Sequence, residues 1–300
     1  MKKIILSTLA AVMALVPALA GTFSKSYPLK GFTGIQASHV FHVYLSPSSE
    51  CSVKIEAPDY LEPYIKVEVS RNQLILSVEN LPKAVERQLS REKSGAIRAD
   101  VRMPSLESIM LSGAANLEAD GDFPMIRVPF KLNISGAAKA SGLSIKAASM
   151  DIRMSGAANA GLKGGFDRVD LEASGASKAR LGVDAASVSA ELSGSAHLDI
   201  EGTFDRMSVE ASGASQADLK SDSTLSSLDI QCSGASSVNS RNAKARDVSV
   251  ELSGASNCKV TALRAIEIEA TGASTCSYEA GPDVKIDVIQ VSRGATLRKL

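Results

Sequence analysis

Glutamate residues recur along this chain at intervals that would suit acid–base or metal chemistry. They are Glu172, Glu191, Glu210, Glu251 and Glu269, with Gln231 in the place of one carboxylate. Carboxylate pairs can catalyse glycoside hydrolysis, and carboxylate oxygens can bind calcium. On neighbouring repeats, however, they would lie about 5 Å apart and repel one another. We expect a solvated charged face, with Arg168, Arg206 or dissolved cations as counter-ions.

The histidines and serines lack the partners that catalysis requires. His39 and His42 lie three residues apart in an expected strand, so they would point to opposite faces and could hardly share a metal ion. His197 is expected to point outward. The many serines occur without a G-x-S-x-G nucleophile motif, which favours a structural row of hydroxyl groups. We therefore expect no catalytic residue, no bound metal and no cofactor.

A second recurring set of polar residues is the better candidate for binding. Each member lies three residues after a recurring glycine, and we call the set the polar strip: Asn116, Lys139, Asn159, Lys178, His197 and Gln216. These residues are polar and regularly spaced, and the alternation along each expected strand directs their side chains outward. A binding surface is one interpretation, and an ordinary solvated surface is the other.

The four cysteines are Cys51, Cys232, Cys258 and Cys276, and their spacing matches no zinc-binding template. Cys258 and Cys276 occupy the same position in consecutive repeats. Stacked strands would place their Cα atoms about 4.8 Å apart, within the disulfide range of about 4.4–6.8 Å. We predict a disulfide between them or a close inward stack, with Cys51 and Cys232 free.

These positions are set by a repeat with a period near twenty residues. The phrase Ser-Gly-Ala, or a close variant, occurs ten times, with glycines at 113, 136, 156, 175, 194, 213, 234, 254, 272 and 294. Apolar residues lie two, four and six positions before each glycine, and polar residues lie between them. Alternation resumes after the glycine, so each repeat predicts two half-buried strands joined by a corner of small residues.

This pattern predicts an all-β fold, a right-handed parallel β-helix, or solenoid, with about twenty residues per rung. Phe166 and Phe204 lie two rungs apart, with Ala185 in the rung between, which predicts a large–small alternation in the core. We expect irregular capping rungs over residues 21–105, with strands at 40–45, 52–57, 65–69, 74–78 and 97–103. The Ser-Gly-Ala repeats of residues 106–300 would continue the same solenoid. A charged segment, 83–95, predicts an exposed loop or short helix.

The N-terminus and the composition limit where the protein acts. Residues 1–20 carry Lys2 and Lys3, an apolar run and Ala18-Leu19-Ala20, which is typical of a secretory signal peptide. Without those lysines, 31 basic residues face 33 acidic ones, so no basic surface for nucleic acid is indicated. No later segment is apolar enough to span a membrane. We expect export to the periplasm or the cell surface.

Several segments resemble the bacterial family named putative auto-transporter adhesin, head GIN domain. They are residues 31–35 (GFTGI), 40–45 (VFHVYL), 52–57 (SVKIEA), 74–76 (LIL) and the PSL of 104–106 leading into 111–114 (LSGA). The resemblance implies a right-handed β-helix of the adhesin-head kind and supplies no catalytic residues. Together with the repeat it favours a non-enzymatic, envelope-associated binding module for a glycan or protein. A polysaccharide lyase or glycoside hydrolase on a β-helix scaffold is the alternative.

Overall fold

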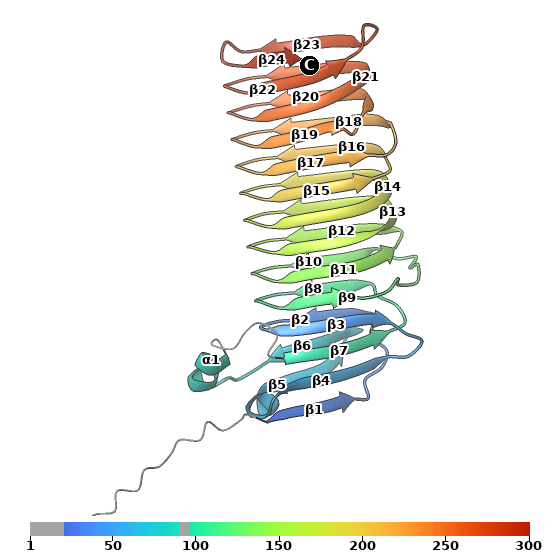
Figure 1. Ribbon diagram of the computed structural model, residues 1–300, viewed down its shortest axis with the longest axis vertical. Helices are drawn as coiled ribbons and strands as arrows, with labels where there is room; N and C mark the ends of the chain where they lie inside the picture. Colours follow the sequence, from blue (N-terminus) through green and yellow to red (C-terminus); the bar gives the residue numbers. More distant parts are fainter. Residues whose placement is uncertain (1–20, 90–96) are drawn as a thin grey trace, which may run out of the picture.

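The computed structural model describes residues 21–89 and 97–300 and shows a tall stack of strands (Figure 1). The expected signal peptide, 1–20, lies outside the described residues, as does the end of the charged segment 83–95. The described part of that segment forms helix α1 (Lys83–Leu89). Within the described residues, no helix has both the length and the apolar character needed to cross a membrane.

Each rung of the stack contributes one strand to each of two facing sheets. From the Ser-Gly-Ala repeats, the first sheet contains β8 (Ser108–Leu111), β10 (Phe130–Ile134), β12 (Ser149–Met154), β16 (Phe204–Ala211), β18 (Leu225–Cys232), β20 (Ala245–Leu252) and β23 (Lys285–Val291). The second sheet contains β9 (Asn116–Ala119), β11 (Lys139–Lys146), β15 (His197–Gly202), β17 (Gln216–Ser221), β19 (Ser237–Asn242), β22 (Thr275–Ala280) and β24 (Thr296–Lys299). Three long strands pass from the second sheet into the first: β13 (Asn159–Ala173), β14 (Lys178–Leu192) and β21 (Asn257–Ala270).

The strands of the repeat region pair in parallel, rung upon rung, which confirms the predicted parallel β-helix. For example, β13 and β14 are in register from Asn159 opposite Lys178 to Ala173 opposite Leu192. Residues at the same repeat position are therefore direct neighbours across strands, as the pairing of Glu172 with Glu191 shows. The register turns each sequence position into a straight row of side chains along the stack.

The Ser-Gly-Ala corner keeps the backbone hydrogen-bond ladder intact between the two sheets. Gly194 has a φ of +70°, a left-handed conformation that residues with a Cβ adopt at a cost. The amide of Ser195 donates to the carbonyl oxygen of Gly175 in the rung before it, at 2.7 Å, and Gly194 accepts likewise from Ala214. A Cβ built on Gly194 would lie 2.9 Å from the Gly175 oxygen. Glycine is therefore needed both for conformation and for close stacking.

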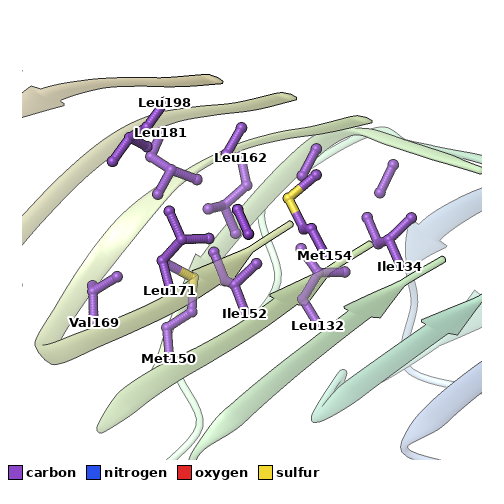
Figure 2. Close-up of a cluster of buried hydrophobic side chains, with 14 of the residues drawn as sticks. Leu132, Ile134, Met150, Ile152, Met154, Leu162, Val169, Leu171, Leu181 and Leu198 are labelled. Carbon is purple, nitrogen blue, oxygen red and sulfur yellow. The ribbon is translucent and has the colours of Figure 1, made fainter. Parts of the chain in front are cut away.

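The core lies between the two sheets and follows the alternation in the sequence. Figure 2 shows Leu132, Ile152 and Leu171 of the first sheet beside Leu162 and Leu181 of the second, and all five side chains are buried. The predicted alternation of large and small residues is present as well. Phe166 pairs with Ala185, which pairs with Phe204, and all three are buried. Ala185 thus lies between two phenylalanines and leaves room for both.

The strands expected before the repeats are present, with a stacking order that differs from their order in the sequence. They are β2 (Gly34–Ala37), β3 (Phe41–Pro47), β4 (Ser52–Pro58), β5 (Ile65–Ser70), β6 (Gln73–Val78) and β7 (Ile97–Met103), preceded by β1 (Thr22–Tyr27); a 3-10 helix spans Asp59–Tyr64. The rung of β2 and β3 lies between that of β6 and β7 and that of β8 and β9. At the lower end of the stack in Figure 1 the pairing is antiparallel: β1 pairs with β4, β4 with β7, and β5 with β6.

Candidate functional site

The polar strip forms one continuous row on the outer surface of the second sheet. The register pairs Asn116 with Lys139, Lys139 with Asn159, and Asn159 with Lys178. It then pairs Lys178 with His197 and His197 with Gln216. All six side chains are at least partly exposed, while the residues on either side along each strand are buried. The structure thus brings together all the residues of the strip along the axis of the solenoid.

A second outward row runs beside the strip, two residues further along each strand, and it was not singled out from the sequence. It contains Arg180, Asp199, Asp218 and Asn239 on four consecutive rungs. Its sequence signal is the pair of aspartates that follow His197 and Gln216 at the same spacing. In this row Asp199 and Asp218 are direct neighbours, and residues of the polar strip donate hydrogen bonds to both carboxylates.

The centre of the strip is tied to this second row by short polar contacts. His197 Nε2 donates to Asp199 Oδ1 at 2.9 Å. The other oxygen of Asp199 is approached by Lys178 Nζ at 3.5 Å and by Arg180 Nε at 3.6 Å. Gln216 Nε2 donates to Asp218 Oδ2 at 2.9 Å. Positive and neutral donors therefore balance the two adjacent carboxylates, which would otherwise repel.

The glutamates form a row on the opposite, first sheet, as the register of Glu172, Glu191 and Glu210 shows. These three glutamates line a groove of about 710 Å³ together with serines of the repeat corners, such as Ser174 and Ser193. The arrangement is an open, extended groove with a regular row of anionic groups.

The expected counter-ions of the glutamates are not the observed ones. Arg168 binds Asp170 of its own strand at 2.7 Å, and Arg206 lies 4.0 Å from Asp205. The partner of Glu172 is Arg153, at 3.4 Å. Within residues 21–89 and 97–300, Glu191, Glu210, Glu251 and Glu269 form no ion pair. The negative charge of this row is therefore screened mainly by solvent and dissolved ions.

The two N-terminal histidines occupy different environments. His39 lies at a rung corner with a φ of +62°, not in a strand as expected, because Ser38-His39-Val40 takes the place of a Ser-Gly-Ala corner. His42 extends the row of the polar strip beyond Asn116. Its ring stacks on Tyr44 with centroids 4.4 Å apart, and its Nε2 lies 3.7 Å from a Glu118 oxygen. The expected reason for their separation, opposite faces of one strand, therefore does not apply to His39.

The cysteines expected to point inward do so. Cys258 and Cys276 are register partners on β21 and β22, and both are buried, as is Cys232 on the facing sheet. All are thiols in the structure. Burial raises the pKa of Cys276 to about 12 and that of Cys232 to about 11, because the thiolate cannot be solvated there. A disulfide between Cys258 and Cys276 stays a prediction.

Comparisons with known proteins agree with the fold. A sequence profile described as "Putative auto-transporter adhesin, head GIN domain" matches residues 31–197 and 180–282. No curated protein sequence matches the chain. Two similar solved structures are described as putative adhesins, from Parabacteroides distasonis (TM-score 0.61, 13% identity) and Parabacteroides merdae (TM-score 0.57, 14% identity). The alignments cover 94% and 93% of this chain, and 98% and 96% of those chains.

A third similar structure, from Parabacteroides distasonis, is described as a putative lipid binding protein. It has a TM-score of 0.56 and 11% identity, and the alignment covers 94% of this chain and 98% of that one. At such identities these similarities establish a shared fold.

Proposed function

The chain belongs to the family described as putative auto-transporter adhesin, head GIN domain, and from this premise we propose that it is an exported, non-catalytic binding module of the bacterial envelope. Its binding surface is the outer face of the second sheet, with the polar strip at its centre. The protein acts in the periplasm or at the cell surface, as a secretory signal at residues 1–20 would require.

The observation that carries this proposal is the unbroken register of the strip over six rungs. Parallel strands repeat about every 4.8 Å, so the strip spans about 24 Å from Asn116 to Gln216. A row of this length offers many separate polar contacts to an extended ligand. Several weak contacts along one rigid surface add up to useful affinity, and no deep pocket is required.

The chemistry of the strip favours a hydroxyl-rich or anionic polymer. Lys139 is exposed and forms no ion pair within the described residues, so its ammonium group is available to an incoming ligand. Asn159 and Gln216 are also exposed and can donate and accept hydrogen bonds. An envelope or host glycan provides hydroxyl and carboxylate groups for such donors. We therefore place glycans first among the ligands to be tested.

The test compares retention and cleavage on the same polysaccharides. Purified protein is incubated with envelope and host polysaccharides, and both bound protein and released oligosaccharides are measured over time. The triple variant Lys139→Ala/Lys178→Ala/His197→Ala is expected to lose retention. A matched triple variant on the first sheet, Glu191→Gln/Glu210→Gln/Glu251→Gln, is expected to keep it.

Two results would count against the proposal. Retention that survives the strip variant but is lost with the first-sheet variant would move the binding surface to the opposite sheet. Time-dependent release of oligosaccharides that disappears in Glu191→Gln alone would establish the lyase or hydrolase alternative, because removal of a single catalytic group costs orders of magnitude in rate.

A further inference from the structure

We propose that His197, Asp199 and Asp218 form a binding site for one divalent transition-metal ion of the zinc type. One ligand atom from each of the three side chains can be chosen so that all lie within 4.8 Å of one another. All three side chains are partly exposed on the second sheet, so an ion can reach them. This inference does not depend on the proposed binding function, because it concerns the ion alone.

The backbone brings the three side chains together without a dedicated loop. His197 and Asp199 are two residues apart on β15, so they point to the same side of the sheet. Asp218 lies on β17, and the register makes it the direct neighbour of Asp199. Because both strands lie inside a continuous sheet, the three groups are held on a rigid surface.

The surroundings of the two carboxylates differ. Asp199 Oδ2 lies 3.5 Å from Lys178 and 3.6 Å from Arg180, which are ion-pair distances longer than hydrogen bonds, while Oδ1 is directed to His197. Asp218 accepts one hydrogen bond at Oδ2, from Gln216 at 2.9 Å, and one at Oδ1, from Asn239 at 3.1 Å, so each oxygen keeps a lone pair for an ion. Partners of this kind fix the direction of metal ligands in known sites. The hydrogen bond from His197 Nε2 to Asp199 gives way when the neutral ring shifts its proton to Nδ1 and Nε2 binds the ion.

A buried oxygen atom next to these residues supplies an independent indication. Asn239 donates to Asp218 through its amide nitrogen, while its Oδ1 atom is inaccessible to solvent and has no hydrogen-bond partner. Leaving such an atom unpaired is costly, and an ion or its bound water is a common explanation.

The ligand set selects the class of ion. An imidazole nitrogen with two carboxylates suits zinc and related first-row ions, and three protein ligands leave a fourth position open for water or a ligand oxygen. Calcium requires six to eight oxygen ligands, which these side chains do not provide. Lys178 and Arg180 neutralise much of the carboxylate charge, so their removal should strengthen metal binding.

The test is a titration of tag-free protein with zinc by isothermal calorimetry, and with cobalt(II) by absorption spectroscopy. One equivalent of zinc is expected to bind, and calcium is not. His197→Ala and Asp218→Asn are expected to weaken zinc binding at least about tenfold, since loss of an outer partner alone typically costs 10–100-fold. Lys178→Ala is expected to strengthen it by up to about tenfold, because one repulsive charge is removed. Glu191→Gln on the first sheet is the control and is expected to leave it unchanged.

These measurements distinguish zinc bound at this site from zinc bound by cysteine thiolates. They also distinguish a loss of zinc binding from a loss of folding. A gain of affinity in Lys178→Ala cannot result from a loss of folding, and circular dichroism of each variant checks the fold. The proposal is overturned if no equivalent of zinc binds. It is also overturned if His197→Ala and Asp218→Asn bind zinc as tightly as the parent protein, or if cobalt shows a thiolate charge-transfer band.

Discussion

The most demanding prediction concerns Gly194, which lies at a rung corner between Gly175 and Gly213. We expect Gly194→Ala, and still more Gly194→Val, to destabilise the solenoid strongly. The glycine has a φ of +70°, and a left-handed conformation costs a residue with a Cβ about 1–2 kcal/mol. The new Cβ would also lie 2.9 Å from the Gly175 oxygen and 3.1 Å from its nitrogen. Both are backbone atoms, so they cannot rotate away.

The two effects give an estimate of the loss. Overpacking against atoms that cannot move typically costs about 1–3 kcal/mol, so Gly194→Ala should lose about 2–5 kcal/mol in total. For a protein of this size, 1 kcal/mol corresponds to about 2–3 °C in melting temperature. The expected decrease is therefore about 4–15 °C. A valine adds a branched side chain at the same point and should exceed this range.

The assay is thermal unfolding followed by circular dichroism, with Gly182→Ala and Lys178→Ala as controls. Gly182 lies on β14, and a Cβ there would meet only the Cβ of Lys163, at an ordinary 3.7 Å. Gly182→Ala should leave the melting temperature unchanged or raise it, because alanine restricts the unfolded chain. Equal melting temperatures for Gly194→Ala and Gly182→Ala would refute the close stacking of the corners.

Further predictions concern buried hydroxyls, thiols and one ion pair. Ser215→Ala should be neutral or stabilising by up to about 1 kcal/mol in urea unfolding, because the buried Ser215 hydroxyl has no hydrogen-bond partner. Ser236→Ala should instead cost about 1 kcal/mol, because the Ser236 hydroxyl donates to the Ala211 oxygen at 3.0 Å. Mass mapping of the non-reduced, exported protein should find a disulfide between Cys258 and Cys276, or both as thiols, and a link between Cys51 and Cys232 would contradict the register. In reduced, native protein near neutral pH, alkylation should reach Cys51 before Cys276, whose pKa burial raises to about 12. The hydrogen bonds from Arg98 lower the pKa of Asp100, so this pair stabilises the fold above the carboxyl's unfolded pKa of about 3.9 and ceases to do so as the pH falls through the lower, folded pKa. The difference in urea midpoint between the parent protein and Arg98→Ala should accordingly shrink at acidic pH, and a difference that grew on acidification would contradict the assignment.

The repeat region was predictable because every rung must stack in register on its neighbours. Alternating residues identify the strands, and the small Ser-Gly-Ala phrase identifies the corner, so positions such as Lys178 and His197 could be placed in one row from the sequence alone. The inward pair of Cys258 and Cys276 followed from the same register. In each case the position relative to the glycine determines the neighbour, since stacked rungs leave little freedom.

The N-terminal stacking order was not predictable from the same pattern. The rung of β2 and β3 has His39 at its corner in place of glycine, so the repeat phrase is absent there. Its insertion between two later rungs depends on long-range pairing that the local sequence does not encode. The contacts of Asp199 and Asp218 were also missed, because ion pairs between rows depend on side-chain reach as well as on register.

On the proposed function, the polar strip binds its ligand through many weak contacts along one face. The most direct test measures the dissociation constant of a retained polysaccharide for the parent protein, for Lys139→Ala, Lys178→Ala and His197→Ala singly, and for the triple variant. An exposed polar contact contributes about 0.2–1 kcal/mol, so each single change should weaken binding by no more than about fivefold. The triple change should weaken it by up to about a hundredfold, which is enough to abolish retention of a weakly held polysaccharide. A triple variant that binds as tightly as the parent protein, or a single change that alone abolishes binding, would contradict the claim.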